Sequence, residues 1–101
     1  MPITVPEIPV FIPRELRALC AGAVPGKLPQ ISLSAGDVRG LLAELARLHP
    51  QVYVQLCDER GEPRQHINVF VNDDHVRVRA GLETPLCAGD MVTILPAVSG
   101  G

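Results

Sequence analysis

One segment of the chain has a clear helical pattern, and this pattern limits the folds that the rest of the chain can join. Its apolar residues recur at spacings of three and four, as in a helix with one buried face, and they are Val38, Leu41, Leu42, Leu45 and Leu48. Ser34 and Asp37 form a Ser-x-x-acid pattern that predicts the helix start, and Pro50 predicts its end. Gly40 costs about 1 kcal/mol relative to alanine inside a helix, so a helix over 37–48 is expected to depend on packing against a sheet.

The segments around this helix alternate apolar and polar residues, which is typical of strands with one buried face. The expected strands are Gln30–Ser34, Ile67–Val71, 75–78 after a turn at 72–74, and 91–95. A first strand is expected from about Val10, with Pro6 and Pro9 in a lead-in, because proline removes ladder donors. Two segments rich in turn residues, 21–29 and 57–65, are expected to be loops.

The order of these elements predicts the fold class. The chain has 101 residues, which is enough for one domain with a single modest core. One amphipathic helix among short strands favours an α+β arrangement of two layers. The core is expected to be aliphatic, because the aromatic residues are only two phenylalanines and one tyrosine.

Charge and hydropathy exclude several classes of function. The formal net charge is −2, and acidic and basic residues are interleaved without a basic stripe, which disfavours nucleic-acid binding. No apolar run is long enough to span a bilayer, and the N-terminal residues lack a charged start followed by a long apolar segment. We therefore expect a cytoplasmic protein that binds neither nucleic acid nor membrane.

The cysteines and histidines do not form a metal-binding pattern. The cysteines are odd in number and far apart, at Cys20, Cys57 and Cys87. Without a C-x-x-C pair they argue against a disulfide framework and a zinc site, and no histidine stands at ligand spacing from them. We expect no metal site, and we expect the cysteines to pack as small hydrophobic residues. Asp73, Asp74 and His75 are interpreted as a solvated turn.

The sequence ends in Gly100-Gly101 directly after an apolar strand. Glycine adds no side chain to a core, but it offers an unhindered α-carboxylate. Residues 96–101 could span roughly 20 Å when extended, which is enough to enter the active site of another protein. A disordered terminus or a cloning remnant could also end in two glycines. The expected division is a domain at 1–95 and a flexible tail at 96–101.

A docking surface is expected on one face of the sheet. Ile67–Val71 places Asn68 and Phe70 on the face opposite its three aliphatic residues, and Leu95 is expected to share that face. An aromatic side chain facing water is a typical interface anchor, so Phe70 and Leu95 form a candidate patch near the base of the tail. The alternative is that a loop such as 57–65 covers one of them. Pro96 is expected either to direct the tail or simply to end the strand.

The most specific pattern is in the C-terminal third. It consists of Val-Asn-Asp at 71–73, Gly-Asp at 89–90, and Val-Thr-Ile-Leu-Pro-Ala-Val at 92–98 before the Gly-Gly. Together with Ile12-Pro13 and Leu16-Arg17, this pattern resembles the ubiquitin-like β-grasp sulfur carriers, which deliver sulfur for thiamin, molybdopterin and, in actinobacteria, cysteine. It is most similar to the carriers of cysteine biosynthesis and their relatives in secondary metabolism. The resemblance implies a β-grasp fold, with a mixed sheet packed on one main amphipathic helix. The proline-rich start and the length of loop 21–29 depart from the family.

The resemblance also implies a chemistry for the terminus. An E1-like activating enzyme would use ATP to adenylate Gly101, and sulfur would then displace AMP to give a thiocarboxylate. A sulfur-accepting enzyme, either a cysteine-synthase-like pyridoxal-phosphate enzyme or a thiosugar or thioacid synthase, would take the sulfur. The chain itself would bind no cofactor and would be a carrier rather than an enzyme. Ser99 and Gly100 would lead the terminus into the partner, and Pro96, Ala97 and Val98 would join Phe70 and Leu95 in partner binding.

Three other functions share features of this pattern. A ubiquitin-like protein modifier would use the same activation step to form isopeptide bonds to lysines. A small subunit of molybdopterin synthase would form a permanent complex with a larger catalytic subunit, and an interaction module would have an unreactive terminus. The sequence leaves these alternatives and the identity of the sulfur acceptor open.

Overall fold

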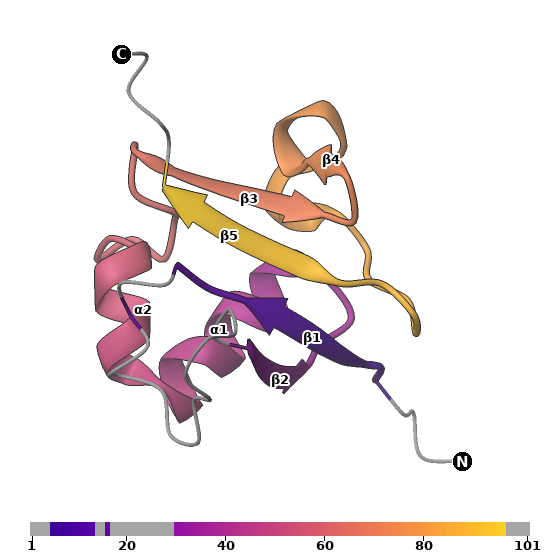
Figure 1. Ribbon diagram of the computed structural model, residues 1–101, viewed down its shortest axis with the longest axis horizontal. Helices are drawn as coiled ribbons and strands as arrows, with labels where there is room; N and C mark the ends of the chain where they lie inside the picture. The colour runs from indigo at the N-terminus through magenta and orange to yellow at the C-terminus, as the bar shows by residue number, and fades with distance from the viewer. Residues whose placement is uncertain (1–4, 14–15, 17–29, 97–101) are drawn as a thin grey trace.

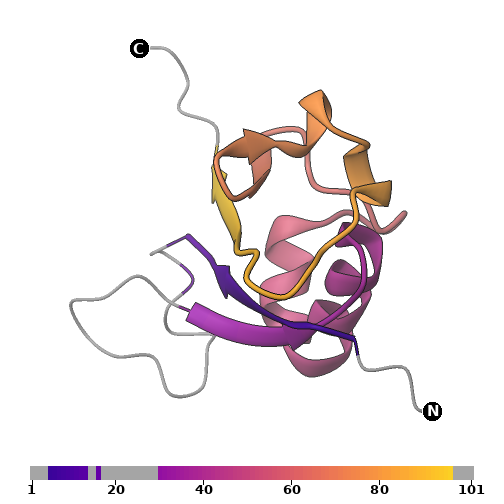
Figure 2. The same ribbon diagram turned by 90° about the vertical axis from the view of Figure 1, so that its right-hand side faces the viewer.

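The computed structural model describes residues 5–13, 16 and 30–96, and these form a mixed β-sheet with two helices on one face (Figures 1 and 2). The strands are β1 (Glu7–Phe11), β2 (Gln30–Ser34), β3 (Ile67–Val71), β4 (Asp74–His75) and β5 (Val92–Pro96). The helices are α1 (Val38–Leu48) and α2 (Pro50–Leu56). The α+β class with a mixed sheet is therefore confirmed.

The strands are ordered β2-β1-β5-β3-β4 across the sheet. β1 and β5 run parallel, and the other neighbouring pairs are antiparallel. β5 thus lies between the first strand and β3, as Figure 1 shows. The strand that leads to the C-terminal residues is consequently a central strand with partners on both sides.

Helix α1 begins where the sequence predicts, but with a different cap. Asp37 is the N-cap residue, with φ −154° and ψ 173°, and its Oδ1 accepts a hydrogen bond from the Gly40 amide at 2.7 Å. A Cβ at Gly40 would lie 3.0 Å from this oxygen, so the glycine makes room for the cap. The predicted contribution of Ser34 is wrong, because that residue is the last of β2. The predicted apolar stripe is buried except at Leu48, which is 47% exposed.

Helix α2 is a second helix that the sequence pattern did not predict. Pro50 ends α1 as expected, but it also occupies the first turn of α2, where its missing N–H costs no hydrogen bond. Val52 and Leu56 lie four residues apart and are both buried. Packing of this pair against the core therefore stabilises a helix in a segment that contains two β-branched valines.

Two strands differ in their bounds from the prediction. β1 begins at Glu7 rather than near Val10, and Pro9 lies within it opposite Ser32 of β2. β5 pairs with β1 only at Val10 and Phe11, so Pro9 lies in a part of β1 that has a single partner strand. Proline is tolerated at such an edge position, which explains why the strand can include it. β5 is one residue later than expected.

The strand expected at 75–78 is mostly absent. β4 contains only Asp74 and His75, and Val76–Val78 forms a 3-10 helix. His75 caps that helix, because its Nδ1 accepts a hydrogen bond from the Arg77 amide at 3.0 Å. The preceding turn contains Asn72 in the left-handed region, with φ 56°. The side chain of Asn72 donates to Asp90 at 3.1 Å, which ties this turn to the one before β5.

The inward faces of the strands and the helices form an aliphatic core. Its sheet residues alternate with outward residues and are Ile8, Val10, Ile31, Leu33, Ile67, Val69, Val71, Val92 and Ile94. The helices contribute Val38, Leu41, Leu42, Leu45, Val52 and Leu56. This core confirms the expected division of β3 and β5 into an inward and an outward face.

Candidate functional site

Four side chains form a continuous row across the outward face of the sheet. Phe11 of β1 lies opposite Thr93 of β5, Thr93 lies opposite Phe70 of β3, and Phe70 lies opposite His75 of β4. Directly paired residues point to the same side of a sheet, so these four share one face. Each of them is half-buried. We call Phe11, Thr93, Phe70 and His75 the outward row.

The predicted Phe70–Leu95 patch is placed as expected. Asn68 is the partner of Leu95 and Thr93 is the partner of Phe70, so Phe70 and Leu95 are diagonal neighbours within reach of each other. Leu95 is 38% exposed. The ring of Phe70 is in edge contact with the ring of His75, with centroids 5.2 Å apart and planes at 73°. The placement is confirmed, while the role in partner binding stays a prediction.

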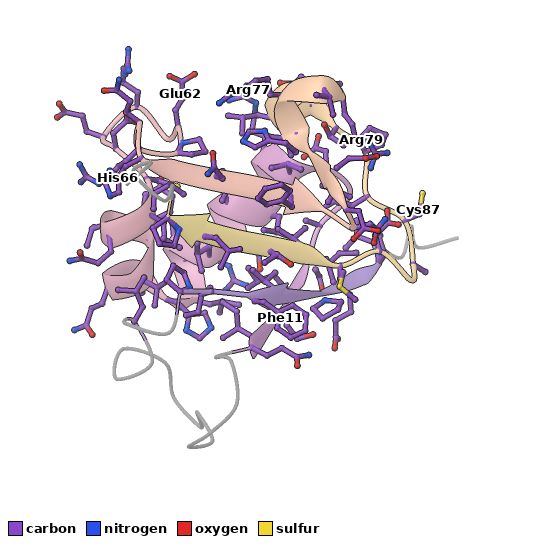
Figure 3. All side chains as sticks on the ribbon, turned by 45° about the horizontal axis from the view of Figure 1, so that its top comes forward. Phe11, Glu62, His66, Arg77, Arg79 and Cys87 are labelled. Carbon is purple, nitrogen blue, oxygen red and sulfur yellow. The ribbon has the colours of Figure 1, made fainter. Side chains whose placement is uncertain are left out.

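Phe11 is a member of this face that sequence reasoning did not single out. Figure 3 shows it on β1, the parallel neighbour of β5. The alternation of Ile8, Val10 and Ile12 was the available signal, because it places Phe11 on the opposite side from the core. Its position beside Thr93 depends on the long-range pairing of β1 with β5, which no local pattern reveals. Both phenylalanines of the chain therefore lie in the outward row.

His75 is held by two further contacts of its ring. Its Nε2 lies 3.1 Å from Oδ1 of Asn68, and its Nδ1 accepts the Arg77 amide hydrogen. Burial of the ring, and secondarily the positive charge of Arg77, hold the pKa of His75 below its ordinary value. The ring is therefore neutral near pH 7, and it connects β3, β4 and the following 3-10 helix.

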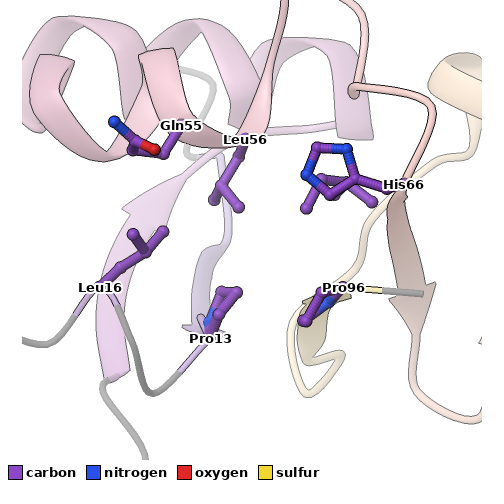
Figure 4. Close-up of a pocket in the computed structure, with 7 residues that line it drawn as sticks. Pro13, Leu16, Gln55, Leu56, His66 and Pro96 are labelled. Atoms are coloured by element: carbon purple, nitrogen blue, oxygen red, sulfur yellow. The ribbon is translucent and has the colours of Figure 1, made fainter. Parts of the chain in front are cut away.

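A small cavity of about 130 Å³ opens beside the end of β5 (Figure 4). Its buried floor is formed by Pro13, Leu56 and Ile67. Gln55, His66 and Pro96 are exposed and form part of its lining. Pro96, the last residue of β5, thus stands at the edge of an apolar hollow, at the point from which a tail would leave the domain.

The remaining predicted tail residues lie outside the residues that the structure describes. They are Ala97, Val98, Ser99, Gly100 and Gly101. Of the predicted site residues, the structure therefore places Phe70, Leu95 and Pro96. Leu95 and Pro96 end β5 opposite Asn68 and Ile67, at the start of β3.

The cysteines differ in their surroundings. Cys57 is buried, as expected, and its burial, with a smaller effect from the charge of Asp58, raises the pKa of the thiol to about 11. The expectation of packing is wrong for Cys87, which is exposed in the turn before β5, where its amide donates to Asp90. Cys20 lies outside the described residues.

Within residues 5–13, 16 and 30–96, no three His, Cys, Asp or Glu side chains are grouped closely enough to hold a metal ion. In the same part of the chain, no helix has the length and apolar character needed to cross a membrane.

Comparison with known proteins identifies the family. The ThiS family matches residues 23–101. The chain is 38% identical over 99 residues to the sulfur carrier protein CysO of Mycobacterium tuberculosis, with 94% of this chain and 99% of that protein covered. It also resembles a chain in the crystal structure of the Amycolatopsis orientalis BexX/CysO complex, with a TM-score of 0.75, 33% identity, and 93% and 99% of the two chains covered.

A third relative is named as a protein modifier rather than a sulfur carrier. The solution structure of small archaeal modifier protein 1 from Methanosarcina acetivorans superimposes with a TM-score of 0.73 and 32% identity, covering 96% of this chain and 98% of that one. Matches to carriers and to a modifier confirm the ubiquitin-like β-grasp fold. The chain therefore belongs to the ThiS family of ubiquitin-like sulfur carriers.

Proposed function

We propose that this sulfur carrier is loaded at Gly101, whose terminal carboxyl is converted to a thiocarboxylate that donates sulfur to a biosynthetic enzyme. The observation that carries the proposal is the extent of the family match, which continues through residue 101 and so includes the Gly-Gly. The relative CysO supports it, because that protein is named a sulfur carrier and matches nearly the whole chain.

The proposed chemistry explains why the reacting end consists of glycine. A carboxylate is a poor electrophile, and transfer of AMP from ATP, with release of pyrophosphate, turns it into an acyl-adenylate with a good leaving group. A sulfur nucleophile then forms a C–S bond to the Gly101 carbonyl carbon, and the C–O bond to AMP breaks. Glycine has no Cβ beside that carbon, so the approach of the nucleophile is unhindered.

The domain would act as a handle for this reacting group. Tethering the sulfur to a protein raises its effective concentration at the acceptor and withholds free sulfide from solution. The activating and accepting enzymes would perform the catalysis, with ATP used by the former. The acceptor that we favour is a cysteine-synthase-like pyridoxal-phosphate enzyme, because the chain resembles CysO of Mycobacterium tuberculosis over nearly its whole length.

The outward row would be part of the surface that such enzymes bind. It contains the rings of Phe11 and Phe70, and the exposed Leu95 lies diagonally beside Phe70 on the same face. Aromatic side chains are enriched among interface anchors. It also shares a strand, β5, with the root of the tail. The relative in the BexX/CysO complex supports binding to a larger protein in general.

The test is a loading reaction followed by intact-mass measurement. The protein is incubated with an activating enzyme that loads CysO, with ATP and with sulfide. We expect one terminal oxygen to be exchanged for sulfur. Variants that lack Gly101, or that carry one extra residue after it, should remain folded by circular dichroism and should not be loaded. R39A, which changes an exposed residue of α1, is the control and should be loaded normally.

Two outcomes would contradict the proposal. One is the absence of exchange in the wild-type protein while CysO is loaded in the same mixture. The other is loading of the variant without Gly101. The mass of the protein isolated from its native cells shows whether Gly101 is the terminal residue there and carries the free carboxyl.

A second candidate function, protein modification, is favoured by one observation, the match to small archaeal modifier protein 1. The same activated Gly101 would then form an isopeptide bond with a lysine amine. Recovery from cells of peptides in which a lysine amine is joined to the C-terminal segment of this chain through Gly101 would support the modifier. Loading without such adducts would support the carrier.

A further inference from the structure

The ring of His75 contacts Asn68, Arg77 and Phe70, and its hydrogen bonds with the first two determine where its proton lies. The Arg77 amide N–H points to Nδ1 at 3.0 Å, and a backbone N–H is always a donor. Nδ1 must therefore present its lone pair. The single hydrogen of the neutral ring is then on Nε2, which donates to Oδ1 of Asn68 at 3.1 Å.

The same hydrogen bonds hold the His75 ring in a T-shaped arrangement with the ring of Phe70. Nε2 binds Asn68, which is two residues before Phe70 on the same face of β3, so the ring is held beside the phenyl ring. The edge-to-face geometry is one that aromatic pairs prefer. Asn68 and Arg77 therefore fix the ring from two sides, and the ring in turn limits where the phenyl group can move.

We infer that His75 is a positioning residue for the outward row, and that it holds Phe70 in place only while Nδ1 carries no proton. A proton on Nδ1 would replace an acceptor by a donor that faces the Arg77 N–H. The cap of the 3-10 helix would be lost, and the edge contact with Phe70 would be released with it. The functional part of this inference rests on the proposed function, because it assigns the outward row to partner binding.

The charges around the ring set the direction of the pH dependence. The 3-10 helix contributes Arg77, β3 contributes the uncharged Asn68 and Phe70, and the turn of His75 itself contributes the exposed Asp73 and Asp74. Burial and Arg77 lower the pKa from its ordinary value of 6.5. Because the unfolded chain binds the proton more readily, the contribution of this cap is present above pH 6.5 and is lost as the pH falls toward the pKa of the folded state.

The experiment is a pH titration of the free protein by NMR. At pH 7.5, we expect the His75 ring to carry its hydrogen on Nε2 and none on Nδ1. As the pH falls, the Arg77 amide and the Phe70 ring protons should shift with the same midpoint as His75. H66Q, which replaces an exposed histidine just before β3, is the control and should leave the shared midpoint of His75, the Arg77 amide and Phe70 unchanged. Hydrogen on Nδ1 at pH 7.5, or a Phe70 signal that ignores the His75 midpoint, would overturn the inference.

A binding measurement tests the link to function. With the activating enzyme as the probe, affinity should fall roughly 3- to 10-fold between pH 7.5 and the acidic side of the His75 midpoint, which matches the loss of one aromatic edge contact. N68A should show a reduced affinity already at pH 7.5, and H66Q should behave as wild type. An affinity with the same pH profile in wild type and H75Q would overturn the positioning role.

The two proposals fail separately. The NMR midpoints do not involve sulfur, so they can be confirmed in a protein that is never loaded. Conversely, normal loading of Gly101 with an unlinked Phe70 would leave the proposed function intact and remove only the role of His75.

Discussion

The two faces of the sheet use the same strands but different chemistry. On β3, the inward residues Ile67, Val69 and Val71 are at most 9% exposed, whereas Asn68 and Phe70 on the other face are half-buried. On β5, the inward residues are fully buried and Leu95 is 38% exposed. The inward face is aliphatic throughout, and the outward row combines rings with hydroxyl and imidazole groups. The difference indicates that the inward face stabilises the fold and that the outward face supplies specific contacts.

The largest effect is expected from a cavity in the covered face. Leu41 of α1 is fully buried, so L41A should lower the free energy of unfolding by about 2–5 kcal/mol, as measured by chemical denaturation. L48A on the same helix is the control, because Leu48 is 47% exposed and should cost clearly less. Equal losses in both variants would break the assignment of stability to the inward face.

The next largest effect is expected on the outward face, where a substitution should change the affinity for the partner rather than the free energy of unfolding. F70A should weaken binding to the activating enzyme by at least about 30-fold, because truncation of an aromatic anchor typically costs about 2 kcal/mol or more. Its effect on unfolding should be smaller than that of L41A. V78A is the matched control, since Val78 is 74% exposed and lies outside the outward row. The affinities are measured by titration calorimetry. An equal loss of affinity in V78A and F70A would contradict the assignment of partner binding to the outward face.

A smaller effect is expected where α1 begins. Asp37 caps the helix through the Gly40 amide, so D37A should cost about 1 kcal/mol of stability, and D37N should retain most of it. Thermal unfolding of the two variants measures this. Partner affinity should not change with either, because the cap belongs to the covered side. A change in affinity without a change in stability would contradict that separation.

The smallest effect is expected from an exposed ion pair. Arg39 of α1 lies 2.8 Å from Glu83, but both side chains are more than half exposed. R39A should therefore change the free energy of unfolding by no more than about 0.5 kcal/mol. A double-mutant cycle with E83A at low and high salt measures the coupling. A coupling well above 1 kcal/mol that survives high salt would show that this surface contributes more stability than its exposure suggests.

The sequence was sufficient for the inward face because its signals are local. The spacing of apolar residues in α1 and their alternation in β2 and β3 each lie within a dozen residues. The apolar residues that these patterns place on one face are the buried ones, with the exception of Leu48. α2 could not be predicted in the same way. Its two valines are β-branched and do not favour a helix, so the helix depends on the packing of Val52 and Leu56 on the core.

The outward face was predicted only in part, because its signals are long-range. Phe70 and Leu95 followed from alternation within their own strands. Phe11 joins them through the parallel pairing of β1 with β5, and His75 joins through a strand of only two residues. The capping of Arg77 by His75 competes with strand extension, and this side-chain contact cannot be seen in an alternating pattern.

The central position of β5 also has a mechanical consequence. A force applied at Pro96 and directed along the strand would load the hydrogen bonds to β1 and to β3 at the same time, in shear rather than one after another. Strands loaded in this way resist extraction more strongly than an edge strand that peels away. A protein that binds the residues after β5 and pulls on them would therefore displace the whole domain before it separated β5 from the sheet.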